Sequence, residues 1–247
     1  MLRRLFSAEL LGVSAFLYSF SISSSLAQDA KQGAAEEILR GVEKVYATCK
    51  SYRDSGTVAS EELLAAGKQH DTAQFSTAFV RPDSFRFEYQ RGADERKKRY
   101  IIWANGRDVR SWFSRDPRRE NKPESLKSDL QMAAGVTRGT STIISNLLLA
   151  DSSLLKEPPL QQLPDASFDG KKCVRFYRRY RLPDLDNGPR LNITDVYWIE
   201  KRTFLIRRIE TETKSAKGSF RKIIIYTPKI DEEISAKELE FNPRATR

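Results

Sequence analysis

The stretch FSTAFVRPDSFRFEYQ (residues 75–90) alternates in polarity on both sides of an Arg-Pro pair. The residues that share one parity are Phe75, Thr77, Phe79, Phe85, Phe87 and Tyr89. Alternate residues of a β-strand point to the same face of its sheet, so the pattern predicts two strands with one aromatic face. Arg81 has the same parity, although a packed core does not favour a guanidinium. Pro82 cannot donate to a sheet ladder, so it marks an edge, a corner or a bulge.

Strand patterns continue on both sides of this stretch. Residues 51–60 favour a strand, and residues 97–115 favour a hairpin because Asn105-Gly106 lies between two β-rich runs. Further strands are predicted within residues 171–181, 193–214 and 218–230, and residues 233–243 close the chain.

Helical patterns interrupt the strands in two places. Residues 34–50 carry an apolar stripe at helical spacing, and two short apolar stripes follow within residues 116–165. The members of these two stripes are Leu126, Leu130, Ala133 and Ala134, then Ile143, Ile144, Leu147 and Leu148. The pattern predicts an α+β fold with one antiparallel sheet of about eight to eleven strands.

The first 27 residues resemble a secretory signal. Arg3 and Arg4 precede an apolar run that is short for a membrane span, and small residues come before Gln28. An uncleaved anchor is the alternative. We expect residues 28–247 to be one mature domain in the periplasm. This domain carries a formal charge of +9, because the signal accounts for +1 of the +10 of the whole chain. A basic surface suits an anionic partner, and export favours lipid headgroups over nucleic acid.

The chain has two cysteines, Cys49 and Cys173. Export places them in an oxidising compartment, so we expect a disulfide between them, with two buried free thiols as the alternative. Two distant cysteines and one histidine do not form a metal-ligand cluster, so no metal site is predicted.

Motifs that carry catalysis are missing from the sequence. His70 is the single histidine, no serine lies in a nucleophile elbow, and no glycine-rich phosphate loop occurs. We therefore expect a protein that is not an enzyme and uses no cofactor.

Four motifs make the chain resemble the LolA-like periplasmic lipoprotein carriers and the wider outer-membrane lipoprotein-sorting proteins. They are VRPDSFRFEY (80–89), WANGRDVRSW (103–112), VYWIEKRTFLIRRIE (196–210) and the closing Phe-Asn-Pro (241–243). The resemblance implies a strongly curved antiparallel sheet that forms an unclosed β-barrel. An N-terminal helix and a helical lid, within about residues 116–165, would cover a hydrophobic cavity.

The resemblance also implies a site and a role. The residues expected to line the cavity or the lid are Phe75, Phe79, Arg81, Phe85, Phe87, Tyr89, Trp103, Leu130, Ile143, Ile144, Leu147 and Leu148. Arg81 falls on the family's arginine at the cavity mouth, and we expect it to hold the lid closed through backbone carbonyls.

The implied function is a monomeric carrier that binds the acyl chains of a lipid or lipoprotein and shuttles them toward the outer membrane. Its partners would be an inner-membrane donor and an outer-membrane acceptor, with transient contact at the membrane surface and none with nucleic acid. The alternative is an envelope sensor or scaffold with the same fold, which binds a lipid-bearing ligand or a protein partner.

Overall fold

The computed structural model describes residues 33, 35–65, 67–92, 98–151, 158–182, 190–216 and 218–243. The expected signal, residues 1–27, lies outside them. The strands are β1 (Ser51–Leu64), β2 (Gly67–Val80), β3 (Ser84–Arg91), β4 (Lys98–Asn105), β5 (Asp108–Phe113), β6 (Glu120–Asn121), β7 (Gln161–Phe168), β8 (Lys171–Leu182), β9 (Leu191–Glu200), β10 (Ile206–Ser215), β11 (Gly218–Tyr226) and β12 (Lys229–Ile230). The helices are an N-terminal helix over residues 35–48, α2 (Leu126–Ala133), α3 (Thr140–Leu148) and the 3₁₀ helix η2 (Ala236–Leu239).

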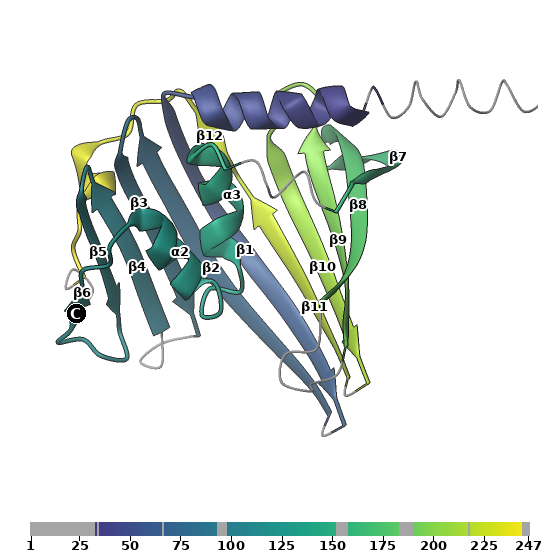
Figure 1. Ribbon diagram of the computed structural model, residues 1–247, viewed down its shortest axis with the longest axis horizontal. Helices are drawn as coiled ribbons and strands as arrows, with labels where there is room; N and C mark the ends of the chain where they lie inside the picture. The colour runs from purple at the N-terminus through teal and green to yellow at the C-terminus, as the bar shows by residue number, and fades with distance from the viewer. Residues whose placement is uncertain are drawn as a thin grey trace, which may run out of the picture.

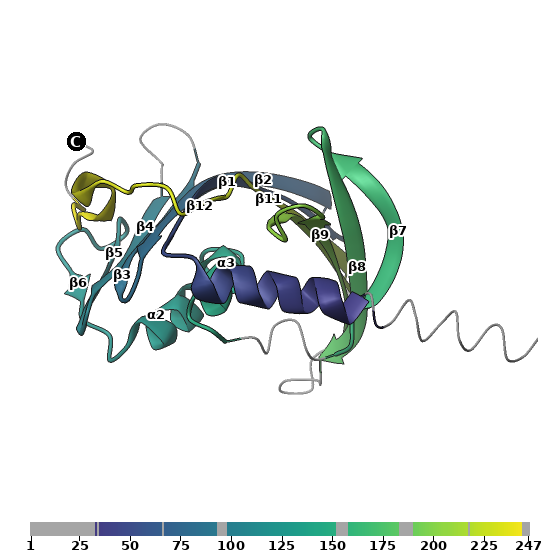
Figure 2. The ribbon, with the colours of Figure 1, turned by 90° about the horizontal axis from the view of Figure 1, so that it is seen from above.

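All of these strands belong to one 12-stranded sheet (Figure 1). Its order is β6-β5-β4-β3-β2-β1-β11-β10-β9-β8-β7, and β12 pairs with β1 outside this path. The sheet bends into an arc around the helices, as Figure 2 shows from above, and its two edges do not pair with each other among the described residues. The expected unclosed half-barrel is therefore confirmed.

The two edges of the sheet are short or irregular. On one side β6 has only two residues. On the other side β7 contains Pro164, and its register with β8 shifts between Leu163 and Ala166.

No helix among the described residues combines the length and the apolar character needed to cross a membrane.

The stretch at residues 75–90 forms the hairpin of β2 and β3. Phe75 lies opposite Tyr89, Thr77 opposite Phe87 and Phe79 opposite Phe85, so the aromatic side chains share one face of the sheet. Arg81 and Pro82 lie in the turn between the strands. The register continues without a slip, so the proline makes the corner of a hairpin and introduces no bulge there.

The hairpin predicted around Asn105-Gly106 is also present. Asn105 pairs with Asp108, so Gly106 and Arg107 are the two central residues of the turn. Gly106 has a φ of 62°. A left-handed conformation at the first central position favours glycine, because a Cβ there is strained.

The three α-helices lie inside the arc, on the concave face of the sheet (Figure 2). The N-terminal helix crosses the strand ends, where Gly41 packs against Phe204: a Cβ at residue 41 would lie only 2.7 Å from that ring. Its Tyr46 is fully buried, and the hydroxyl accepts a hydrogen bond from the Ile206 amide at 3.1 Å. These contacts fix the helix to the half of the sheet that α2 and α3 do not cover.

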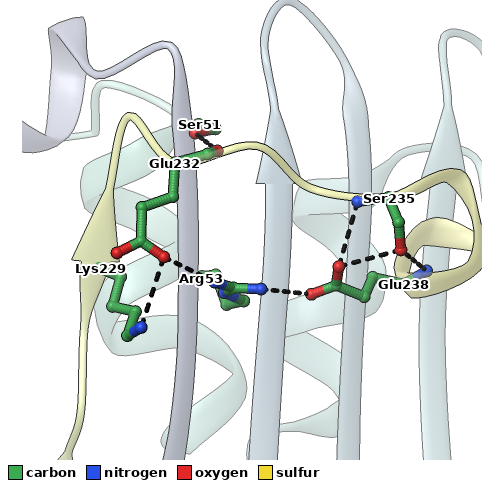
Figure 3. A network of polar contacts seen from close by, with 6 residues as sticks. All are labelled: Ser51, Arg53, Lys229, Glu232, Ser235 and Glu238. Atoms are coloured by element: carbon green, nitrogen blue, oxygen red, sulfur yellow. Dashed lines mark hydrogen bonds and ion pairs between the residues drawn. The ribbon is translucent and has the colours of Figure 1, made fainter.

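The C-terminal segment, residues 231–243, lies on the convex face, and we call it the strap. Arg53 of β1 points to that face and contacts two carboxylates of the strap, Glu232 at 2.6 Å and Glu238 at 3.0 Å (Figure 3). Ser235 caps η2 through the Glu238 amide, and the Glu238 carboxylate accepts from the Ser235 amide in return. The strap therefore holds a fixed path over the strands.

Candidate functional site

The covered half of the concave face carries most of the predicted site residues. Five aromatic side chains of β2 and β3 are at most 4% exposed: Phe75, Phe79, Phe85, Phe87 and Tyr89. Leu130 of α2 and Ile144, Leu147 and Leu148 of α3 are at most 2% exposed. All nine belong to one hydrophobic cluster, and Ile143 packs against it. The structure thus brings these predicted residues together.

The space between the sheet and these helices is filled by the same side chains. Phe85, Phe87, Leu130 and Leu148 have no exposed surface, which leaves no water-sized void against them. The helical cover is as expected, but the part of the expected cavity that these four residues would line is filled. A ligand could lie against these four residues only if the helices moved.

We call residues 126–148, which comprise α2, α3 and their connection, the lid. Ser125 caps α2 by accepting from the Ser128 amide at 3.2 Å. The two helices are joined by hydroxyl groups: Ser141 donates to the Leu130 carbonyl at 2.9 Å, and Thr137 donates to the Ala133 carbonyl at 2.9 Å. Because these bonds stay within the lid, it can move as one unit.

Arg81 forms hydrogen bonds with the lid and with the end of the N-terminal helix. Its Nη2 donates to the carbonyl of Leu148, the last residue of α3, at 3.0 Å. The same nitrogen donates to the Tyr46 carbonyl at 2.9 Å, and Nε donates to the Cys49 carbonyl at 2.8 Å. These carbonyls lie at the C-terminal ends of two helices, where unpaired acceptors and the helix dipole favour a cation. Arg81 therefore joins the β2–β3 turn, the N-terminal helix and the lid.

Two further hydrogen bonds join the lid to the sheet, and sequence reasoning missed both. Lys222 of β11 donates to the Arg138 carbonyl at 2.7 Å, and burial lowers the pKa of this lysine. Ser111 of β5 donates to the Asp129 carboxylate at 3.1 Å. Burial raises the pKa of Asp129, while the bond from Ser111 acts in the opposite direction. A signal was present, because Lys222 shares the parity of the apolar Ile224 and Tyr226.

Trp103 is the predicted site residue that lies elsewhere. It pairs with Arg86, so it faces away from Phe85 and Phe87 and lies on the convex side of the sheet. There its indole donates to the Leu239 carbonyl and its ring contacts Phe241. Trp103 therefore anchors the strap, and the expectation that it lines the cavity or lid was wrong.

The expected disulfide was also wrong, because both cysteines are free and buried. Cys49 follows the N-terminal helix beside β1, whereas Cys173 lies on β8. The strands β11, β10 and β9 separate β1 from β8 in the sheet. Burial raises the pKa of both thiols, which makes them poor nucleophiles.

A buried polar cluster occupies the other half of the concave face. Arg178 of β8 contacts the Asp195 carboxylate of β9 at 3.1 Å, and its Nη2 donates to the Tyr197 hydroxyl at 2.6 Å. Thr211 donates to the other oxygen of Asp195 at 2.8 Å. The cluster satisfies its own charges, so it divides the concave face into a polar half and an apolar half under the lid.

Known proteins match this chain only in structure. No family model and no curated protein matches the sequence. LprF from Mycobacterium bovis is 12% identical, with a TM-score of 0.43, and the match covers 85% of this chain and 97% of that one. The LolA superfamily protein NE2245 from Nitrosomonas europaea is 13% identical, with a TM-score of 0.36, over 84% and 97% of the two chains.

A third match is a putative outer membrane lipoprotein-sorting protein domain from Vibrio parahaemolyticus. It is 9% identical, with a TM-score of 0.35, over 85% of this chain and 96% of that one. Likeness at this level does not establish membership of a family, so function has to follow from the contacts and charges of this chain.

Proposed function

We propose that the protein is an exported carrier that encloses the acyl chains of a lipid or lipoprotein between the lid and the sheet. It would shuttle this cargo through the periplasm from an inner-membrane donor to an outer-membrane acceptor. The observation that carries the proposal is the attachment of the lid. A largely apolar interface is held by four polar groups of the sheet: Arg81, Ser111 and Lys222 through hydrogen bonds, and Asp71 through an ion pair with Arg138 at 3.6 Å.

The energies of the lid contacts and of an enclosed acyl chain are of similar size, so cargo can replace these contacts. Burial of a CH₂ group contributes about 0.8 kcal/mol, so a chain of about 16 carbons gains roughly 13 kcal/mol on enclosure. Removing four lid side chains, Leu130, Ile144, Leu147 and Leu148, from their contacts costs about 1.5–3 kcal/mol each. The two amounts are comparable, so an acyl chain can replace the lid contacts and the lid can still close over it.

Locking the lid to the sheet tests this proposal. Ser111 Oγ and Asp129 Oδ1 lie 3.1 Å apart across the interface, so cysteines at both positions can be joined by oxidation or by a short thiol crosslinker. The locked protein should fail to bind a fluorescent fatty-acid analogue, and reduction of an oxidised pair should restore binding. The buried Cys49 and Cys173 should not react, which the parent protein checks.

The chain offers a matched control. Ser125 Oγ and Ser128 Oγ also lie 3.1 Å apart, but both belong to the start of α2. Cysteines at these positions would be crosslinked without joining the lid to the sheet. If both locked proteins bind the analogue like the parent, cargo does not pass under the lid and the carrier proposal fails.

The packed interior favours a second candidate, an envelope sensor or scaffold that recognises a partner without opening. Crosslinking in the envelope separates the two. A carrier should be captured with both a membrane donor and an acceptor and should retain lipid after gentle extraction. A sensor or scaffold should be captured with one regulated partner and no lipid.

A further inference from the structure

A groove of about 300 Å³ opens at the margin of the lid, next to the ends of β3, β4 and β5. Two rows of side chains cross these strands on the concave face. Tyr89, Tyr100 and Phe113 lie opposite one another in register and form an aromatic row. Arg91 and Lys98 pair in the next row, and Arg115 lies two residues beyond Phe113. The lid completes the groove with residues 135, 136 and 138.

The groove is strongly cationic. Arg91, Lys98, Arg115 and Arg138 all line it. The carboxylate that contacts these cations is Asp71, at 2.6 Å from Arg91 and 3.6 Å from Arg138. Asp71 is 25% exposed and is shared between the two arginines. Among the described residues, four cations surround one carboxylate, so this part of the groove has an excess of positive charge that suits an anion.

Tyr89 supplies an unused hydrogen-bond donor at the base of the groove. The residue is 2% exposed, and its hydroxyl has no hydrogen-bond partner among the described residues. Buried polar groups normally have partners, so an orphan hydroxyl at the wall of a groove points to a ligand atom. Burial raises the pKa of Tyr89, so the hydroxyl stays protonated and able to donate.

We propose that this groove binds a phosphate group, with Tyr89 donating to a phosphate oxygen and Arg91 and Arg138 supplying the opposite charge. Lys98 and Arg115 would attract the anion from the rim. A volume of about 300 Å³ leaves room for a phosphate group between these side chains.

The phosphate can come from two sources. A lipid headgroup would sit in the groove while its acyl chains pass under the adjoining lid, and this source rests on the proposed carrier function. Free phosphate would need the groove alone. The aromatic row favours the lipid, because Tyr100 and Phe113, with ring centroids 5.6 Å apart, offer an apolar wall beside the cations.

Calorimetric titration of the mature protein with three probes tests the groove and its source. The probes are inorganic phosphate, dihexanoylphosphatidic acid and dihexanoylglycerol, which lacks the phosphate. We expect phosphatidic acid to bind more tightly than either of the others, and added salt to weaken its binding. Equal affinities for phosphatidic acid and inorganic phosphate would assign the groove to the free anion.

Tyr89→Phe removes one oxygen that has no partner, so the variant should fold like the parent. It should bind both phosphate-bearing probes about tenfold more weakly, because a hydrogen bond to a charged group is lost, and should bind dihexanoylglycerol unchanged. Tyr226→Phe is the matched control: this hydroxyl is also buried and unpartnered, but it lies on β11 outside the groove.

Arg115→Gln should weaken the binding of inorganic phosphate and of dihexanoylphosphatidic acid. Arg118→Gln, three residues later and also exposed, should leave both affinities unchanged. If Tyr89→Phe and Arg115→Gln bind phosphate-bearing probes like the parent, the groove proposal is overturned, whatever dihexanoylglycerol does. If the parent binds inorganic phosphate but neither dihexanoyl lipid, the groove stands as a free-phosphate site and the carrier function fails.

Discussion

Arg81 is a half-buried cation whose hydrogen bonds, among the described residues, go to backbone carbonyls and not to a carboxylate. It donates to the carbonyls of Tyr46, Cys49 and Leu148, at the C-terminal ends of two helices that are distant in sequence. A guanidinium can do this because it carries five donors in a fixed plane. This arrangement answers why an aromatic hairpin carries an arginine at its turn.

Arg81→Leu should loosen the lid without unfolding the protein. The loss of these bonds should lower the free energy of unfolding by about 2–3 kcal/mol, measured by urea denaturation. Amide exchange across α3 should become faster, because its last carbonyls lose their partner. Arg40→Leu is the control, since Arg40 is 67% exposed and lies 3.7 Å from Glu36. A variant in which α3 exchanges as slowly as in the parent would refute the tether.

Asp54 is a carboxyl group buried among tyrosines on β1. Burial raises its pKa to about 6, although the Tyr52 hydroxyl, 2.6 Å away, stabilises the charged form. A raised pKa means that the folded state binds the proton more tightly than the unfolded state. Its contribution to stability is therefore present below pH 4 and is lost as the pH rises through about 6.

Asp54→Asn should prevent this loss of stability at higher pH, because an amide side chain does not ionise. At pH 7 the variant should be more stable than the parent by up to about 3 kcal/mol, and the gap should close as the pH falls toward 4. Urea denaturation at a series of pH values measures both. Asp108→Asn should leave this window unchanged, because Arg110 lowers the pKa of that exposed carboxyl. A difference in the free energy of unfolding between variant and parent that stays constant from pH 4 to 7 would contradict a raised pKa for Asp54.

At the scale of elements, the lid is the part built to move. Ser141 of α3 donates to the Leu130 carbonyl of α2, and the polar contacts of the lid with the sheet are made by Asp129, Arg138 and Leu148. Ionisation of the buried Asp129 opposes closure of the lid, because burial raises the pKa of this carboxyl and makes its charged form costly. The sign is the same as for Asp54, so closure should weaken as the pH rises above the ordinary range of a carboxyl group.

Hydrogen exchange followed by mass spectrometry should show whether the lid opens as a unit. Amides of α2 and α3 should exchange together through one opening that costs less than global unfolding, whereas β1 and β2 should exchange only on global unfolding. Asp129→Asn should slow exchange of the lid at pH 7 and leave β1 unchanged. Lid amides that exchange at the same rate as those of β1 in the parent would mean that the lid does not open on its own.

The sequence was informative where a signal is local. Strand parity at residues 75–89 and the turn at Gly106 were confirmed, and so were the helical stripes of the lid. Local signals failed where the answer depends on distant parts of the chain. Trp103 faces outward because the strap, about 135 residues later, covers that face. The cysteines are unbridged because strand order, which two residues cannot reveal, sets them apart.

At the scale of the whole molecule, no disulfide cross-links the described residues. One sheet and one hydrophobic cluster hold the N-terminal helix, the lid and the strands together. The strap adds ion pairs from Arg53 on the opposite side. Stability therefore should not depend on the redox state of the solution.

Thiol titration checks this directly. Native protein should not react with a disulfide reagent, because both cysteines are buried and their pKa values are raised. In denaturant, without reductant, two thiols should react, and the thermal midpoint should be the same with and without reductant. Arg40→Cys, at an exposed position, should add one thiol that reacts in the native state. Fewer than two reactive thiols in the denatured parent would show that Cys49 and Cys173 form a disulfide.

The two free edges of the half-barrel have a consequence for concentrated solutions. An open sheet exposes unpaired amides and carbonyls, which a second copy could extend into a fibre. Here β6 offers only two residues, and Pro164 removes a donor from β7 beside a break in its register. Neither edge can template a long added strand. The chain can therefore keep its barrel unclosed, with a side for the lid, and still resist polymerisation.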